Sequence, residues 1–402
     1  MQYLVVLADG MADYSIVELG NMTPLQYANT PNIDRLAAQS MIGMVKTIPD
    51  GLKPGSDVAN LSVMGYDPGT LYSGRSSLEA VSMGVELRDA DLALRCNLVT
   101  LSGENEYRDR VMTDYSCGEI STEDAAVFIK DLQDALGNES FEFHAGISYR
   151  HLLVWKNGSG KKLLLTPPHD VSDRVISPYL PQGPDGEILL DMMKKSEKIL
   201  QDHPLNQIRR DKGEKPATSL WFWGEGRKPV LPSFQEKYGL AGSVVTAVDL
   251  VRGLGISAGL TPIKVEGATG GVHTNFAGKA RAALAELKRG QDFVYVHIES
   301  PDEAGHQGSL KSKIWSIEQI DHDVFGEILA QLDHFPELRI MLLPDHPTPV
   351  SLKTHTSDPV PFMIFDKTSP RENPYLVYNE ATSVNGRFIA NGHELMDLFI
   401  NM

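Results

Sequence analysis

The chain has 402 residues, 42% of them hydrophobic, and a formal net charge of −16. At about 150 residues per domain, this length predicts two or three domains, or one large α/β domain that carries an insertion. The hydrophobic content is sufficient for a large buried core. The negative charge argues against nucleic acid and against a membrane surface as partners, because both would repel an acidic protein.

The two cysteines, Cys96 and Cys117, form no Cys-x-x-Cys pair, so we expect neither a disulfide framework nor a cysteine zinc site. No run of about 18 apolar residues predicts a membrane span. The first nine residues are apolar but lack a basic start and reach Asp9, which predicts a first strand rather than a signal peptide. We therefore expect a cytoplasmic protein, with its oligomeric state left open.

Three short apolar runs have the pattern of buried parallel strands, namely Tyr3–Ala8, Phe293–Ile298 and Arg339–Leu343. Helix signals lie between them. Thr30-Pro31 begins one predicted helix, and residues 275–289 form an Ala-rich amphipathic helix that ends before a glycine. Strands that alternate with helices predict an α/β fold, a doubly wound and mainly parallel sheet built from both ends of the chain.

The middle of the chain has a different pattern. Four stretches alternate like strands, at residues 93–101, 141–144, 149–155 and 162–165, and the turn at 157–160 has hairpin chemistry. Residues 182–186 are typical of a linker. We therefore expect a core domain made of residues 1–85 and 180–402, with a smaller α+β domain of residues 86–179 inserted into it.

Asp and His residues gather where the three predicted parallel strands end. They are Asp9 after the first strand, Asp302 and His306 after the second, and Asp345, His346 and His355 after the third. The spacing of Asp302 and His306 is i, i+4, which places both side chains on one face of a helical turn. Ligands bind beyond the carboxyl ends of parallel strands, so we expect these side chains to converge there.

Carboxylates and imidazoles without thiolates suit Mn²⁺, Zn²⁺ or Mg²⁺ in a catalytic site. Three Asp and three His residues are too many for one ion with an open position and sufficient for two. Two ions about 3.5–4 Å apart would clamp the attacking and leaving oxygens of a phosphoryl transfer. The simpler alternatives are that Asp9 forms a turn or caps a helix and that Asp302 and His306 are a solvated pair.

Ser56 is the candidate nucleophile. It follows Pro54-Gly55 and precedes an apolar helix-like segment, so it is expected at a helix N-terminus, where a phosphate is favoured. The alternative for Ser56 is an ordinary helix N-cap. A metal ion nearby would instead activate its hydroxyl as a nucleophile.

These residues carry a resemblance to a known family. The chain resembles the cofactor-independent (2,3-bisphosphoglycerate-independent) phosphoglycerate mutases of the shorter, archaeal-type branch, within the alkaline phosphatase superfamily. The motifs that carry the resemblance are Asp9-Gly10, residues 30–36, 54–57, 72–80, 219–226, 267–270, 301–306 and 344–348, and His355. They extend over essentially the whole chain.

The resemblance implies an alkaline phosphatase-like core and two divalent ions. Mn²⁺ is the metal that we expect at both positions, with Zn²⁺, Mg²⁺ or Co²⁺ as alternatives. One ion would be held by Asp9, Ser56, Asp345 and His346, and the other by Asp302, His306 and His355. Ser56 would take the phosphoryl group from 3-phosphoglycerate as a phosphoserine and return it to give 2-phosphoglycerate, in glycolysis and gluconeogenesis. The inserted domain would cover the substrate and exclude water.

A phosphorylated three-carbon acid needs fixed positive charge for its phosphate and carboxylate, preferably from Arg. The candidates in the inserted domain are Arg150, His151, His169 and Asp170. Arg75 and Lys279 are candidates by resemblance, and each is also compatible with a solvated helix residue.

Two other functions use the same residues. A metal-dependent phosphatase or phosphonate hydrolase would differ only in letting water reach the phosphoserine. A non-catalytic, metal-binding scaffold is disfavoured, because the ligand set and the nucleophile are both complete.

Overall fold

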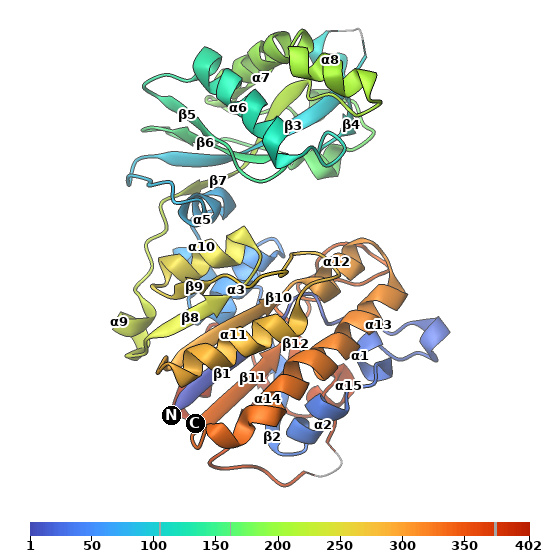
Figure 1. The fold of residues 1–402 in the computed structure, drawn as a ribbon, viewed down its shortest axis with the longest axis vertical. Coiled ribbons are helices and arrows are strands. Elements are labelled where there is room, and N and C mark those ends of the chain that lie inside the picture. Colours follow the sequence, from blue (N-terminus) through green and yellow to red (C-terminus); the bar gives the residue numbers. More distant parts are fainter. Residues whose placement is uncertain (104–105, 161, 374–375) are drawn as a thin grey trace. The chain divides into compact units, whose positions relative to one another are not determined.

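The computed structural model describes residues 1–103, 106–160, 162–373 and 376–402. The chain divides into two compact units (Figure 1). Unit 1 consists of Met1–Tyr72 and Val230–Met402, and unit 2 of Ser73–Pro229. Within the described residues, no helix is both long and apolar enough to cross a membrane.

Unit 1 is built on an eight-stranded sheet in the order β13-β2-β12-β11-β1-β10-β8-β9. The central strand β1 pairs in parallel with β10 on one side and β11 on the other, whereas β12 runs antiparallel to both its neighbours. The prediction of a mainly parallel α/β sheet is confirmed. The strands are β1 (Gln2–Ala8), β2 (Ser40–Val45), β8 (Gly242–Val245), β9 (Thr261–Ile263), β10 (Phe293–Ile298), β11 (Leu338–Leu343), β12 (Val360–Asp366) and β13 (Arg387–Ile389).

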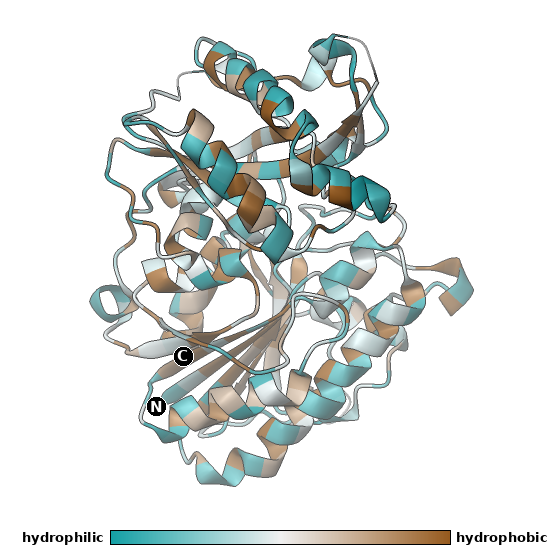
Figure 2. Cartoon of the chain, turned by 45° about the horizontal axis from the view of Figure 1, so that its top comes forward, coloured by the Kyte–Doolittle hydropathy of each residue, from teal (hydrophilic) through white to brown (hydrophobic). Residues whose placement is uncertain are grey.

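Helices pack on both faces of this sheet. Alternate residues of a strand point to opposite faces, and in a central strand such as β1 the residues on both faces are buried. Leu4 and Val6 of β1 belong to the apolar cluster that contains Leu284, whereas Tyr3 packs edge-on against Phe399, with 5.5 Å between ring centroids. The central strands are brown in Figure 2, as expected for strands buried on both faces. The helices are α1 (Pro24–Tyr27), α2 (Pro31–Ala37), α3 (Ser56–Val63), α4 (Pro68–Leu71), α9 (Phe234–Tyr238), α10 (Asp249–Ser257), α11 (Phe276–Lys288), α12 (Ser300–His306), α13 (Leu310–Gln319), α14 (Gly326–Gln331), α15 (Glu380–Ser383) and α16 (Glu394–Asn401).

The two helices predicted in this unit begin where their capping residues stand. Asn275 caps α11 by accepting the N–H of Gly278 at 2.8 Å. Thr30 and Pro31 occupy the N-cap and first position of α2, but the Thr30 side chain makes no capping bond. Instead, Asp321 in the π-helical segment Ile320–Phe325 accepts the free N–H of Ile33 at 2.7 Å.

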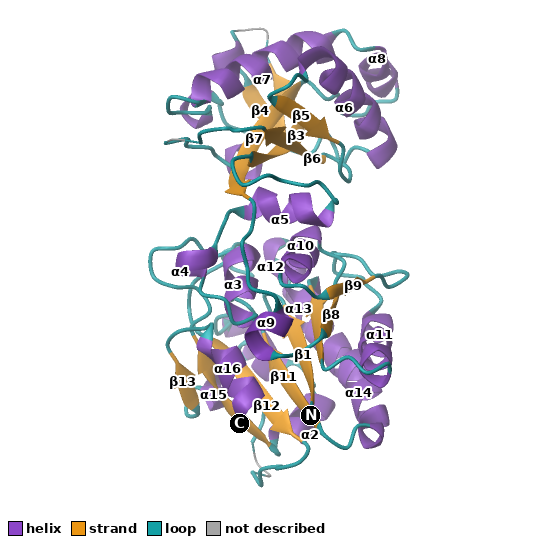
Figure 3. Cartoon of the chain, turned by 90° about the vertical axis from the view of Figure 1, so that its left-hand side faces the viewer, coloured by secondary structure: helices purple, strands orange, loops and turns teal. Residues whose placement is uncertain are grey.

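Unit 2 has a five-stranded antiparallel sheet in which β3 pairs with β4, β6 and β7, and β6 pairs with β5 (Figure 3). Its core includes residues of the strands and of the helices α6 and α7. The strands are β3 (Leu92–Ser102), β4 (Val111–Asp114), β5 (Phe141–His144), β6 (Arg150–Trp155) and β7 (Ser219–Arg227), and the helices are α5 (Arg75–Ser82), α6 (Thr122–Leu136), α7 (Gly186–Gln201) and α8 (Pro204–Asp211).

Two local predictions for unit 2 are wrong. The predicted strand at 162–165 is only an isolated bridge, from Leu164 to Gln182, so the turn at 157–160 closes no hairpin. The segment at 182–186 is no linker to the other unit, because it leads into α7. Unit 2 extends beyond the expected range 86–179 on both sides, since β7 pairs with β3 and α5 packs on both strands.

Candidate active site

The predicted Asp and His residues come together beyond the ends of β1, β10 and β11. In the register of the sheet, Leu7 of β1 lies beside His297 of β10 and Leu343 of β11, so the three strands end at the same level. Asp9 follows directly after β1, α12 begins two residues after the end of β10, and Asp345 lies two residues after the end of β11. The i, i+4 pair of α12 lies on one helix face as predicted, with 3.2 Å between Asp302 Oδ2 and His306 Nε2.

One group of side chains surrounds the Nε2 atom of His346. This atom lies 3.2 Å from Ser56 Oγ, 3.4 Å from Asp345 Oδ2 and 3.7 Å from Asp9 Oδ1. The side chains of Asp9, Asp345 and His346 are inaccessible to solvent. These four residues are the set expected for one ion.

A second group is centred on Asp302. His355 Nε2 lies 3.4 Å from Asp302 Oδ1 and 2.9 Å from His306 Nε2. The two groups adjoin, since the ring of His355 lies over that of His346 with 4.0 Å between centroids. Ligand atoms of Asp302, His346 and His355 therefore also lie within 4.8 Å of one another.

Hydrogen bonds on the far side of these residues orient their free atoms. His306 Nδ1 lies 3.0 Å from Lys353 O, so it donates there and directs Nε2 toward Asp302. Asp345 Oδ1 accepts from the backbone of Gly10 and His346, whereas Oδ2 accepts from the side chain of Asn60 at 2.8 Å. Such outer contacts hold metal ligands in position before an ion binds.

A third carboxylate–histidine cluster adjoins the first group. His297 Nε2 lies 2.8 Å from Asp9 Oδ2 and 3.5 Å from Glu299 Oε2. Burial lowers the pKa of His297 to about 3, so this imidazole is neutral. Burial, together with the charge of Asp302, raises the pKa of Glu299 to about 8. The ammonium of Lys279 donates to His297 O at 3.0 Å and so places a positive charge beside this cluster.

The electrostatics of the first two groups show an excess of buried negative charge. Burial raises the pKa of Asp9 well above its usual range, and the carboxylate of Asp345 adds to the shift. Burial acts in the same direction on Asp302, but contacts with His306 and His355 outweigh it and hold the Asp302 pKa well below its usual range. Isolated buried carboxylates are costly unless a cation compensates them.

The residues present fit divalent metal ions. Asp9 Oδ1 is buried and has no hydrogen-bond partner among the described residues, although it faces His346. Buried oxygens without a partner are rare in proteins, and an ion is one of the few explanations. The donors are carboxylates, imidazole nitrogens and one hydroxyl, which suits Mn²⁺, Zn²⁺ or Mg²⁺.

Ser56 is the first residue of α3, and Gly55 occupies the N-cap position. The alternative of an ordinary Ser N-cap is therefore wrong. All eight residues of α3 are buried, and the Asn60 amide donates to Ser56 O at 2.9 Å, one turn along the helix. The Ser56 hydroxyl is thus held at the positive end of a helix, directed at His346.

The predicted substrate residues of unit 2 lie on different elements. Arg75 pairs with Glu79 at 3.2 Å, and its guanidinium lies over the ring of Trp223. His169 contacts the same ring edge-on, at 5.3 Å between centroids. Arg150 and Asp170 are exposed.

Two of the predicted substrate residues are buried. His151 accepts the N–H of Gly146 at its Nδ1 atom and is 2% exposed. Lys279 has no exposed surface and binds the carbonyl of His297. The solvated alternative for Lys279 is therefore wrong, and both side chains contribute to the interior of their own unit.

Sequence reasoning missed several residues of these clusters. Arg95 is buried in β3, donates to Glu79 at 2.6 Å and lies over Trp223 at 5.0 Å, and burial lowers its pKa to about 10. His297 lies next to the first group of candidate ligands, 2.8 Å from Asp9 Oδ2. Arg95 is the one charged residue of β3, and His297 interrupts the apolar run of β10, which is the signal that could have identified them. Asn60 had no such signal, because the contacts that place it beside the site, with Asp345 and Tyr295, come from distant segments.

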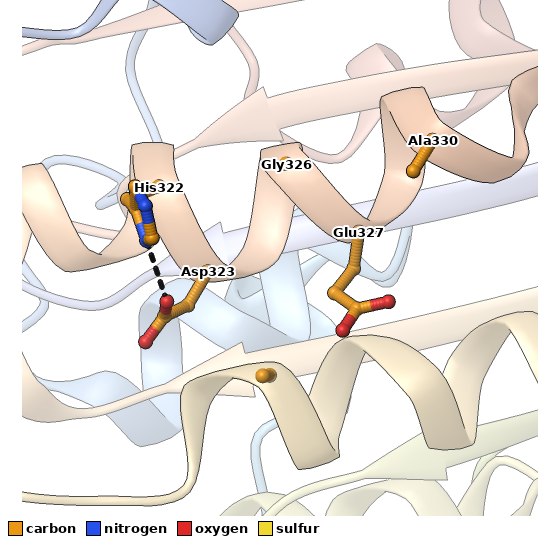
Figure 4. A pocket seen from close by; sticks show the side chains of 6 residues that line it. His322, Asp323, Gly326, Glu327 and Ala330 are labelled. Atoms are coloured by element: carbon orange, nitrogen blue, oxygen red, sulfur yellow. Dashed lines mark hydrogen bonds and ion pairs between the residues drawn. The ribbon is translucent and has the colours of Figure 1, made fainter.

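An open hollow of about 310 Å³ lies elsewhere on unit 1 (Figure 4). Its lining residues are Ala277, His322, Asp323, Gly326, Glu327 and Ala330. None of the candidate site residues is among them. Two of its lining residues, His322 and Asp323, contact each other at 2.7 Å.

The chain is similar to known proteins over its whole length. Residues 37–206 match the family model of 2,3-bisphosphoglycerate-independent phosphoglycerate mutase. A protein of Geobacter sulfurreducens named a probable enzyme of this kind is 47% identical over all of both chains, and one from Methanosarcina mazei is 46% identical over 96% of each.

Two solved structures resemble the chain as well. The PH0037 protein of Pyrococcus horikoshii has a TM-score of 0.82 at 31% identity, covering 100% of this chain and 96% of its own. The cofactor-independent phosphoglycerate mutase of Thermoplasma acidophilum has a TM-score of 0.65 at 25% identity, covering 100% and 99%. The chain belongs to the family of 2,3-bisphosphoglycerate-independent phosphoglycerate mutases.

Proposed function

We propose that this protein interconverts 3-phosphoglycerate and 2-phosphoglycerate by way of a phosphoserine at Ser56. The observation that carries the proposal is the position of the Ser56 hydroxyl, 3.2 Å from His346 Nε2, where six predicted Asp and His residues converge. A phosphoryl group on this oxygen would lie at the N-terminus of α3, where free N–H groups and the helix dipole favour an anion.

The reaction consists of two phosphoryl transfers, one from the substrate to Ser56 and one from Ser56 back to a different hydroxyl of glycerate. In the first, Ser56 Oγ loses its proton and bonds to phosphorus, and the departing oxygen of the substrate takes up a proton to leave glycerate. In the second, the other hydroxyl of the bound glycerate loses its proton and its oxygen bonds to phosphorus, while the bond between phosphorus and Ser56 Oγ breaks and Oγ regains a proton. Glycerate must stay bound between the two transfers, and water must be kept away from the phosphoserine.

We assign Asp9, Ser56, Asp345 and His346 to one divalent ion, and Asp302, His306 and His355 to the other. When bound, the ions neutralise charge on the transferred group and lower the pKa of the nucleophile. Mn²⁺ is our first choice, with Zn²⁺, Mg²⁺ or Co²⁺ as alternatives. The role of the protein is to hold the ligands in place through contacts such as that between Asn60 and Asp345.

The substrate contacts stay predictions. Arg75, Arg150, His151, His169, Asp170 and Lys279 remain candidates, and Arg95 joins them through the ring of Trp223 that it shares with Arg75. A covering role for unit 2 also stays a prediction. We further propose that the enzyme acts in glycolysis and gluconeogenesis in the cytoplasm, the setting that the family resemblance implies.

The test uses metal-stripped enzyme with 3-phosphoglycerate and no 2,3-bisphosphoglycerate, with and without added Mn²⁺. We expect 2-phosphoglycerate to form only with the metal, without release of inorganic phosphate. Phosphate release in place of 2-phosphoglycerate would mean that the same site works as a phosphatase. Formation of 2-phosphoglycerate without metal would contradict the two-ion site.

A further inference from the structure

Thr348 contacts both groups of candidate metal ligands through a single hydroxyl. Its Oγ1 lies 2.5 Å from Asp302 Oδ1 and 3.3 Å from His346 Nδ1. A carboxylate only accepts, so the Thr348 hydroxyl donates its one proton to Asp302. It then accepts the N–H of His346 at Nδ1. The same hydroxyl therefore orients one carboxylate and fixes which nitrogen of the neighbouring imidazole is free.

The backbone of Thr348 is held as firmly as its side chain. The ammonium of Lys313, which has no exposed surface, donates to Thr348 O at 2.8 Å, to Ala12 O at 3.1 Å and to Asp13 Oδ2 at 2.7 Å. Thr348 N in turn donates to Ala12 O at 3.3 Å. One buried cation thus ties the segment after β11 to the segment after β1.

Two glycines allow this close approach. Gly10 has a φ of +62°, and a Cβ there would lie 2.7 Å from Thr348 Oγ1 and 2.6 Å from Asp302 Cα. A Cβ at Gly305 of α12 would overlap the carbonyl oxygen of Thr348. The segments after β1, β10 and β11 therefore meet at Thr348, with no room for a larger residue on either side.

We propose that Thr348 is a positioning residue that sets the relation between the two metal sites, so that loss of its hydroxyl weakens the binding of both ions together. The inference rests on the proposed two-ion site. A residue that orients a ligand of only one site would weaken one ion. Thr348 orients Asp302 of one site and His346 of the other, and its own position is fixed by Lys313.

The test is calorimetric titration of Mn²⁺ into the metal-stripped protein, with electron paramagnetic resonance of the loaded protein as a second readout. In Thr348→Val the shape is kept and the hydroxyl is lost. We expect the affinity for both ions to fall ten- to a hundredfold, the usual effect of removing an outer contact of a metal ligand. We also expect the spin–spin coupling of the Mn²⁺ pair to change.

Thr348→Ser keeps the hydroxyl. Its affinity for both ions should stay within about threefold of the wild-type affinity, a much smaller change than the loss expected for Thr348→Val. Thr30→Val is the matched control, because Thr30 is also buried and its side chain does not cap α2. If Thr348→Val fails to fold, Thr348→Ala removes the same hydroxyl with a smaller side chain, and unchanged binding of either ion by this variant would overturn the inference.

The outcomes separate the two proposals. If the wild type binds two ions and Thr348→Val binds them equally well, or loses only one, the inference about Thr348 is overturned and the proposed function stands. If the wild type binds no ions, the two-ion site itself fails, and with it the role of Thr348.

Discussion

The Ser56 hydroxyl lies 3.2 Å from Nε2 of His346, and both side chains are buried. Such a contact is also typical of a serine activated by a histidine base. Here the rest of the imidazole argues otherwise. Its Nδ1 faces the hydroxyl of Thr348 rather than a carboxylate, whereas its Nε2 faces the carboxylates of Asp9 and Asp345. This arrangement favours two ligands of one cation over a nucleophile and its base.

Substitution of Ser56 separates chemistry from metal binding. Ser56→Ala removes the oxygen that accepts the phosphoryl group but leaves the carboxylates and imidazoles in place. We expect conversion of 3-phosphoglycerate to fall below detection, while calorimetry still shows two ions. Acid-quenched wild type, but not the variant, should carry phosphate on Ser56. A variant with wild-type turnover would end the phosphoserine mechanism.

Substitution of Asp9 should stabilise the metal-free protein and reduce its stabilisation by metal. Burial raises the pKa of Asp9 in the folded state, so the charged carboxylate opposes folding at neutral pH. Asp9→Asn removes this charge and keeps an oxygen for His297, which now lies 2.8 Å from Oδ2. We expect a higher melting temperature in chelator than for the wild type.

Added Mn²⁺ provides the second half of the same test. At a hundredfold excess over its dissociation constant, an ion that binds only the folded state stabilises by about 2.7 kcal/mol. The wild type should show such a shift in melting temperature and Asp9→Asn a much smaller one. Equal shifts in the two proteins would remove Asp9 from the ligand set.

The buried ion pair of Lys313 and Asp13 predicts strong coupling in stability. The Lys313 ammonium lies 2.7 Å from Asp13 Oδ2, and both side chains are almost fully buried. Lys313→Met leaves the carboxylate without its cation and should destabilise by about 3–5 kcal/mol in urea unfolding. Addition of Asp13→Leu should recover part of the loss, because the unpaired charge is then gone. Additive losses would show that the pair is not coupled.

Stability should fall with acid partly because of His151. Burial lowers its pKa in the folded state to about 3, against an ordinary value of 6.5. As the pH falls, His151 therefore takes up a proton in the unfolded chain before it does so in the folded protein. This contribution to stability is complete above pH 6.5 and is lost as the pH falls toward 3, by up to about 1.4 kcal/mol for each step of one in pH.

A matched variant isolates this contribution. His151→Asn keeps an acceptor for the N–H of Gly146, which His151 now binds at 3.1 Å, and removes the titrating group. Urea unfolding at pH values between about 4.5 and 8 should show that the free energy of unfolding changes less steeply with pH in the variant than in the wild type. Identical slopes would assign the acid sensitivity to other residues.

The sequence alone was sufficient for the strands that carry the site. Phe293–Ile298 has the predicted bounds, and β1 and β11 each begin one residue earlier than predicted. Apolar runs that end at Asp, Gly or Pro are local signals, and parallel strands place their carboxyl ends at one edge. The convergence of Asp9, Asp302 and Asp345 therefore followed from the pattern along the chain.

Only the tertiary structure decided what depends on contacts between distant segments. Residues 162–165 have the sequence pattern of a strand but form only an isolated bridge. The sheet of unit 2 instead includes β7, a segment far along the chain, which pairs with β3. Thr348 lies in the motif at residues 344–348, but the role of its hydroxyl does not follow from that motif, because it depends on contact between α12 and the segment after β11. Local sequence determines which backbone shape forms, whereas the partner of a buried polar atom is determined by packing, to which residues from distant parts of the chain contribute.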